Sequence, residues 1–229
     1  MHIPDGFINA GTSLGAGFAS AGGITFAARK VGDMLEDKQV PLAGLVAAFV
    51  FAIQMINFPV AGGTSGHLLG GVLAAVLVGP WAGAVCIAVV LLVQALFADG
   101  GLTALGLNIL NMALIGGLGG YALFVGLRSV LPATKSSVTI SSGIAAAVSV
   151  VFASIGFAAE YALGGTSNLS LSTVAGAMAG IHALIGVGEG MITAATVGMV
   201  LSVRPDLVHG ASDLPPSVPV RTASAQVGS

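Results

Sequence analysis

The chain has 229 residues, of which 55% are hydrophobic and only 7% are charged, and its mean hydropathy is +1.01. Soluble domains carry about 25% charged residues, so this composition excludes an ordinary soluble protein and predicts an integral membrane protein in a lipid bilayer. The net charge of −2 leaves no basic patch for phosphates, which excludes nucleic acid as a partner.

The chain begins Met-His-Ile-Pro-Asp-Gly, and this start can chelate a metal ion. The amine of Met1, the amide nitrogen of His2 and Nδ1 of the His2 ring can reach one ion through two adjoining chelate rings. Three nitrogens then fill three corners of a square, a geometry that suits Ni(II) and Cu(II), with Co(II) as a third candidate. We expect Met1 to be retained, because His2 is too large for removal of the initiator. The alternative is a frayed terminus without function.

Seven hydrophobic segments follow, and they predict an all-α protein of about seven transmembrane helices. The third segment has 14 residues, or about 21 Å of helix, whereas a span needs about 20 residues. We therefore expect a short third helix that either is strongly tapered or begins below the outer surface. The segments are 9–29, 41–58, 66–79, 80–98, 102–127, 138–163 and 171–202.

The basic residues predict the orientation of the chain. If all seven segments span, every Lys and Arg falls on one side, which should be the cytoplasm. The N-terminus is then outside, the C-terminus is inside, and the protein is multi-pass in the cell membrane. We expect residues 1–204 to form the transmembrane metal-binding domain and residues 205–229 to form a polar, disordered cytoplasmic tail.

His67 is the best candidate for the fourth corner of the square. We expect it at the start of the third helix, on the outer side where Met1 and His2 also lie, after a loop over 57–65 that dips inward. The alternative is a polar helix start that bonds to loop carbonyls. Asp5 and Asn57 are candidates to orient the ligand rings. Since the ion must displace protons from its nitrogen ligands, capture should weaken as pH falls.

A rival interpretation uses Ser65, in Gly-Thr-Ser-Gly, with His182. Intramembrane serine proteases of the rhomboid type pair such a serine with a histidine on a late helix. This interpretation leaves the Met-His start without a role, and the loop arginine expected of that family is missing. A passive pore or a purely structural bundle is a third class, which predicts no bound metal.

His182 and Glu189 lie seven residues apart on one face of the last segment, and they should face the bundle interior or a partner. They could form a second ion stop or coupling element, or only a structural polar contact, and the sequence favours neither. Four other intramembrane polar residues are expected to make structural hydrogen bonds between helices: Gln54, Asn108, Asn111 and Glu160.

Several stretches together resemble the CbiM/NikM family, the substrate-binding membrane components of energy-coupling-factor transporters for cobalt and nickel. The resemblance covers nearly all of residues 1–202. The matching stretches are MHIPDGF, NFPVAGGTSGHLLGG, GPWAG, LFADGGLTALGLNILNM and IHALIGVGEGMITA.

This resemblance implies a seven-helix fold that binds Co²⁺ or Ni²⁺, as transported substrate, through the amine of Met1, the amide and ring of His2, and the ring of His67. It also implies that the chain is not an enzyme. A transmembrane coupling subunit and two cytoplasmic ATPases would supply the energy, often with a small auxiliary membrane protein. We find no G-x-x-x-x-G-K-[ST] phosphate loop in the chain and expect no organic cofactor. The short tail favours the cobalt arrangement while planar chemistry favours nickel, so the metal stays open.

Overall fold

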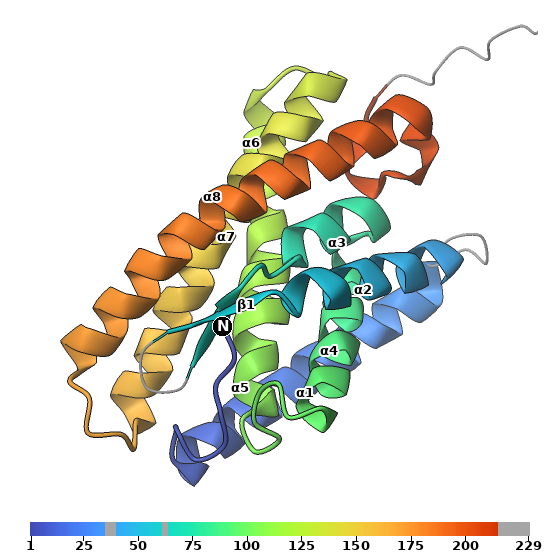
Figure 1. Cartoon of the computed structure of the whole chain (residues 1–229). Helices are drawn as coiled ribbons and strands as arrows, with labels where there is room; N and C mark the ends of the chain where they lie inside the picture. The colour runs from blue at the N-terminus through green and yellow to red at the C-terminus, as the bar shows by residue number, and fades with distance from the viewer. Residues whose placement is uncertain (35–39, 61–63, 215–229) are drawn as a thin grey trace, which may run out of the picture.

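The computed structural model describes residues 1–34, 40–60 and 64–214, which form a helical bundle with one short β-hairpin (Figure 1). The longer helices are α1 (Ala10–Met34), α2 (Val40–Gln54), α4 (Pro80–Leu96), α7 (Lys135–Gly164) and α8 (Leu171–Val203). A further helical stretch runs through α5 (Leu105–Ile109), the π-helix η3 (Leu110–Gly119) and α6 (Gly120–Val130).

Three of these helical stretches are long and apolar enough to cross a membrane: Leu105–Val130, Lys135–Gly164 and Leu171–Val203. The chain is therefore a membrane protein. Each of the seven predicted segments contains helix, so the helical fold is confirmed. The number of spans and the sidedness of the termini stay predictions.

The last two long helices, α7 and α8, lie side by side (Figure 1). Glycines on α8 allow this approach: a Cβ on Gly186 would lie only 2.6 Å from the backbone oxygen of Ala147, and one on Gly190 would lie 2.7 Å from that of Gly143. Small residues four positions apart let helices approach closely in lipid, where dispersion contacts rather than water exclusion drive association. These glycines therefore fix the position of α8, the helix that covers the hairpin.

The region between α2 and α4 differs from the prediction. The helix expected over 41–58 ends at Gln54, and strand β1 (Asn57–Pro59) follows. It pairs with strand β2 (Ser65–His67) in antiparallel register, with Asn57 opposite His67. The two strands thus replace the end of the second predicted helix and the flanks of the loop expected over 57–65, whose residues 61–63 lie outside the described part of the chain.

The third helix, α3 (Gly71–Val78), is shorter than the predicted 66–79, and all its residues are buried. Its length of about 12 Å cannot span a bilayer. The helix cannot begin at residue 66, because Gly70 has φ +72°, a left-handed conformation that ends regular structure and favours glycine. The prediction that His67 begins this helix was therefore wrong: His67 ends β2.

The first part of the tail that was expected to be disordered has regular structure. Two 3₁₀ turns, η4 (Pro205–Leu207) and η5 (His209–Ala211), follow α8, and Val208 and Ala211 are buried. Arg128 also forms an ion pair with Asp213. Burial of these apolar side chains orders a stretch that its polar composition alone does not predict. Residues 215–229 of the predicted tail lie outside the described part of the chain.

Candidate metal centre

The start of the chain is buried inside the bundle rather than frayed. Met1 and Ile3 have no exposed surface and His2 is 4% exposed. The backbone of Ile3 is held on both sides by Asn108, whose Oδ1 accepts from Ile3 N at 2.8 Å and whose Nδ2 donates to Ile3 O at 3.2 Å. Gly101 N also donates to Ile3 O at 2.9 Å. Asn108 therefore has a structural role, but it bonds to the chain start rather than to another helix as predicted, and it helps to place His2.

The rest of the N-terminal segment is anchored to two loops. Oδ1 of Asp5 accepts from the backbone N of Thr103 at 2.7 Å and from its hydroxyl. Further along, Thr166 N donates to Phe7 O, and Asn9 N donates to Gly164 O. The contacts of Asp5 thus fix the path of the chain, and they are made to Thr103 rather than to a histidine ring.

His2 and His67 meet in the interior. Their imidazole rings stack with centroids 4.4 Å apart and an angle of 30° between the ring planes. His67 is fully buried, and its Nδ1 donates to the carbonyl of Leu68 at 2.7 Å. This leaves the lone pair on Nε2, which has no hydrogen-bond partner among the described residues. A buried nitrogen lone pair without a donor costs free energy unless something binds it, so Nε2 is suited to a metal ion.

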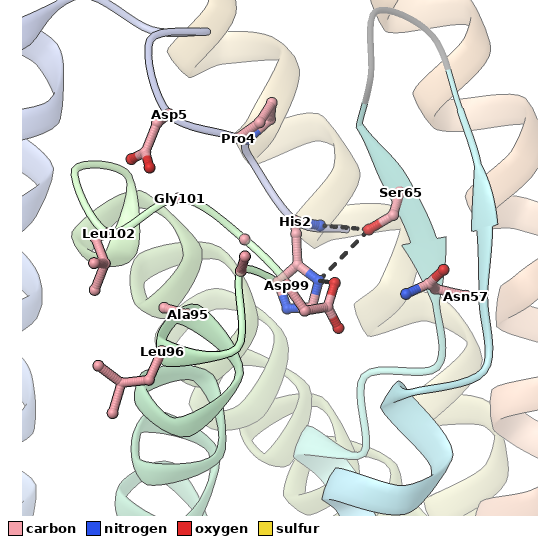
Figure 2. Close-up of a pocket in the computed structure, with 12 residues that line it drawn as sticks. His2, Pro4, Asp5, Asn57, Ser65, Ala95, Leu96, Asp99, Gly101 and Leu102 are labelled. Atoms are coloured by element: carbon pink, nitrogen blue, oxygen red, sulfur yellow. Dashed lines mark hydrogen bonds and ion pairs between the residues drawn. The ribbon is translucent and has the colours of Figure 1, made fainter.

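The two ring nitrogens of His2 have different neighbours. Nε2 lies 3.2 Å from Oε1 of Gln94, while Nδ1 lies 3.2 Å from Oδ1 of Asp99. The backbone N of His2 donates to the Ser65 hydroxyl at 3.4 Å, and the same hydroxyl lies 3.5 Å from Nδ1. Figure 2 shows the side chains of Ser65 and Asp99 directed at His2.

Gln94 and Asp99 were not predicted as site residues. Gln94 is a polar residue in an otherwise apolar helix, and that pattern could have drawn attention to it. Asp99 precedes two glycines, so the local pattern indicated a turn and concealed its contact with the chain start.

Burial sets the protonation of the chain start. Desolvation lowers the pKa of the Met1 amine well below its usual value, although the charge of Asp99 opposes the shift. Burial also lowers the pKa of His2 and outweighs the opposite effect of its hydrogen bond to Asp99. That hydrogen bond in turn lowers the pKa of the Asp99 carboxyl. At neutral pH the interior therefore favours neutral nitrogen ligands beside one ionised carboxylate.

An open cavity of about 650 Å³ leads to His2. Its wall includes Asp5, Asn57, Ser65 and Asp99 (Figure 2). Asn57 lies on this wall and opposite His67 in the hairpin, so the structure brings it near the candidate ligands. A small hydrated ion could reach His2 from this cavity.

The candidate donors at this centre are nitrogen atoms rather than acidic or thiol groups. Within the described ranges, no group of three or more His, Cys, Asp and Glu residues could hold a metal ion. The buried chain start provides a terminal and a backbone nitrogen beside His67.

Glu189 on α8 holds the backbone that follows His67. Its Oε2 accepts from Leu69 N at 2.8 Å and its Oε1 from Gly70 N at 2.7 Å. From the other side, Gln54 Nε2 donates to Leu69 O at 2.6 Å. Irregular backbone deep in a membrane protein must have its polar groups satisfied internally, and these two side chains do so. Glu189 therefore makes a structural polar contact.

His182 does not form the dyad of the protease interpretation. Its Nδ1 donates to Met178 O within α8 at 2.8 Å, and its Nε2 has no hydrogen-bond partner in the described part of the chain. Ser65 instead contacts His2. The geometry therefore gives no support to a serine protease.

Comparison with known proteins identifies the family of the chain. The profile of the CbiM family, described as the cobalt uptake substrate-specific transmembrane region, matches residues 2–207. The fused nickel transport protein NikMN of Rhodobacter capsulatus is 36% identical over 231 residues, which cover 91% of this chain and 64% of that protein. The cobalt transport protein CbiM of Geobacter sulfurreducens is 32% identical over 226 residues, which cover 91% of this chain and 61% of that protein.

A solved structure has the same fold. The crystal structure of a truncated transition metal transporter superposes with a TM-score of 0.81 at 34% identity, and the match covers 88% of this chain and 99% of that one. The two sequence relatives are longer than the region they share with this chain. Together, the matches over nearly the whole length show that the chain belongs to the CbiM/NikMN family of cobalt and nickel transport proteins.

Proposed function

We propose that this protein is the substrate-capture subunit of an energy-coupling-factor importer for Co²⁺ or Ni²⁺. The ion binds to the amine of Met1, the amide and Nδ1 of His2, and Nε2 of His67. The observation that carries the proposal is the stacking of His2 on His67 beside a fully buried Met1. The family match and the relatives' names support cobalt or nickel as the ion.

The chemistry of the donor set favours a planar complex. Three nitrogens of the chain start are joined through short chelate rings and cannot spread into a tetrahedron, and Nε2 of His67 closes the fourth corner. Flat nitrogen-rich sites suit Ni(II), whereas the relatives include transporters of both metals. We therefore keep both ions as substrates. In this proposal Gln94 accepts a hydrogen bond from Nε2–H of His2, the support that a metal-bound imidazole commonly receives.

Transport would need partners. In this proposal the ion enters from the outer face through the cavity beside His2, and a transmembrane coupling subunit with two cytoplasmic ATPases drives its release inward. A small auxiliary membrane protein would join them as a separate subunit. The chain itself catalyses no reaction in this scheme, in keeping with relatives that are named as transport proteins.

The test is metal analysis of the purified protein with an unmodified N-terminus. We expect an equimolar amount of Ni²⁺ with the absorption spectrum of a planar complex. Acetylating the Met1 amine, or making His67→Ala, should abolish binding, because the terminal ligand or the fourth corner is lost. His209→Gln is the control, since His209 lies in η5, away from this centre. Wild-type protein without stoichiometric metal would instead favour a passive pore or structural bundle.

A further inference from the structure

The two partners of the His2 ring are compatible with different states of the proposed centre. Binding of the ion requires a free lone pair on Nδ1, so the remaining ring hydrogen must be on Nε2. Gln94 Oε1, 3.2 Å from Nε2, can accept that hydrogen. Asp99, 3.2 Å from Nδ1, can accept a hydrogen bond only while Nδ1 carries the hydrogen. The Asp99 contact therefore belongs to the ion-free protein.

Asp99 also lies on the wall of the cavity that leads to His2. Its side chain is 18% exposed, and its Oδ2 is buried with no hydrogen-bond partner among the residues described. One oxygen thus contacts a ligand residue, while the other is an unpaired buried acceptor, which is suited to a cation. Figure 2 shows Asp99 beside His2 at the cavity wall.

The backbone around Asp99 is unusual. Ala98 has φ +60°, a left-handed conformation that costs free energy in a residue other than glycine. Gly100 has φ +98°, and a Cβ there would lie 3.1 Å from Cδ2 of His2. The turn that carries Asp99 is therefore held in a strained shape directly against His2.

The negative charge of Asp99 would compensate part of the positive charge of an ion bound at this centre. A divalent ion that displaces the amide hydrogen of His2 leaves a net positive charge in a buried centre, and an uncompensated buried charge is costly. Asp5 is the other carboxylate on the cavity wall, but its Oδ1 is already bonded to Thr103. Asp99 alone of this pair contacts a proposed ligand.

We propose that Asp99 is a positioning residue. It attracts the hydrated ion into the cavity and then releases Nδ1 of His2, so that the ion can bind to that nitrogen. The inference rests on the proposed function and deepens it, since it concerns how the same centre is loaded. The carboxylate acts at long range through its charge and at short range by releasing its contact with the ring. It need not be a ligand in the final planar complex.

The experiment compares Asp99→Asn with Asp213→Asn in the full chain, by stopped-flow mixing with Ni²⁺ at low and high salt. Both variants lose one negative charge, but Asp213 pairs with Arg128 and does not line this cavity, and the amide oxygen introduced by Asp99→Asn could still accept from Nδ1. We expect Asp99→Asn to slow association about tenfold, at the low end of electrostatic steering, and to weaken its salt dependence. The planar absorption spectrum of the loaded protein should be unchanged. Asp213→Asn should change the association rate less than twofold.

Each other outcome contradicts either the role of Asp99 or the proposed function. Equal rates for wild type and Asp99→Asn, equal slowing by both variants, or loss of the planar spectrum in Asp99→Asn would overturn the role of Asp99 in loading while leaving the proposed function intact. If Asp99→Asn fails to fold, the wild-type salt dependence decides, because an association rate insensitive to salt also overturns the inference. Wild-type protein that binds no Ni²⁺ overturns the proposed function itself, and the inference with it.

Discussion

The imidazole ring of His2 stacks on that of His67, with centroids 4.4 Å apart, although one residue belongs to the chain start and the other to a hairpin. The contact depends on a terminal segment that is threaded into the bundle and held there by Asn108 and Gly101. The proposed centre is therefore assembled by tertiary structure, and each support of that structure should be measurable as a change in metal binding.

Extending the chain before Met1 should abolish metal binding. Met1 has no exposed surface, so a tag of many residues has no room there, and the peptide bond before Met1 would replace the amine ligand. The measurement is Ni²⁺ content after purification with a cleavable N-terminal tag, before and after the native start is restored. The same tag placed after Ser229 is the control and should have no effect. Equal metal content in both tagged proteins would contradict the chelate.

Replacing Asn108 by Ala should release the terminal segment. The change removes the donor and the acceptor that hold Ile3 and leaves a buried amide and carbonyl unpaired, at about 1–3 kcal/mol each. We expect Ni²⁺ affinity to fall roughly tenfold to a hundredfold, as measured by titration. Asn9→Ala is a comparison, because the bond from the Asn9 side chain is to Thr12 N at an exposed helix start. Similar losses of affinity in both variants would argue against a specific role for Asn108.

Replacing Glu189 by Gln should weaken metal binding by disturbing His67. Gln can accept from only one of the two amides at Leu69 and Gly70, so one buried donor loses its partner, at a cost of about 1–3 kcal/mol. We expect a lower melting temperature and an altered planar absorption spectrum, because Leu68, which orients the His67 ring, adjoins this backbone.

The matched control for Glu189 is Glu160→Gln. Glu160 is also a buried carboxylate, but it accepts from the side chain of Asn111. This variant should change stability without changing the spectrum of the bound ion. A normal spectrum in Glu189→Gln would show that Glu189 supports the fold alone.

Adding a methyl group at Gly186 should separate α7 from α8. The new Cβ would lie 2.6 Å from Ala147 O, a contact that requires the helices to shift, and overpacking of this kind costs about 1–3 kcal/mol. Gly176→Ala is the control, because nothing lies within 4 Å of a Cβ at Gly176. Thermal unfolding in detergent should show a lower melting temperature for Gly186→Ala alone. Equal melting temperatures would indicate that the helices adjust freely.

The sequence predicted some of these features because their physical signals are local. Long apolar runs predicted α7 and α8 nearly to their ends. The Met-His start was expected near His67, and the ring of His2 is found stacked on that of His67. The chelating role of these residues stays a prediction. Hydropathy could not separate a buried hairpin and a short interior helix from a span, so the region from Asn57 to Val78 was placed wrongly.

Other features depend on tertiary contacts that no local pattern reveals. Asp99 resembles an ordinary turn residue until the chain start is placed beside it. Similarly, the bonds from Leu69 and Gly70 to Glu189 join positions far apart in the sequence, so periodicity could not distinguish a structural contact from an ion stop. The order of residues 205–214 comes from burial against the bundle.

The attachment of α8 to the stretch after His67 has a mechanical consequence. As a helix of 33 residues, α8 is a rod of about 50 Å, and Glu189 fastens its middle to the stretch beside the ring. If α8 moves as a rigid body, a force applied at its C-terminal end, near Val203, would be transmitted to the imidazole of His67. In the proposed importer, a small tilt imposed by the coupling subunit could thereby open one corner of the proposed square and weaken its hold on the ion.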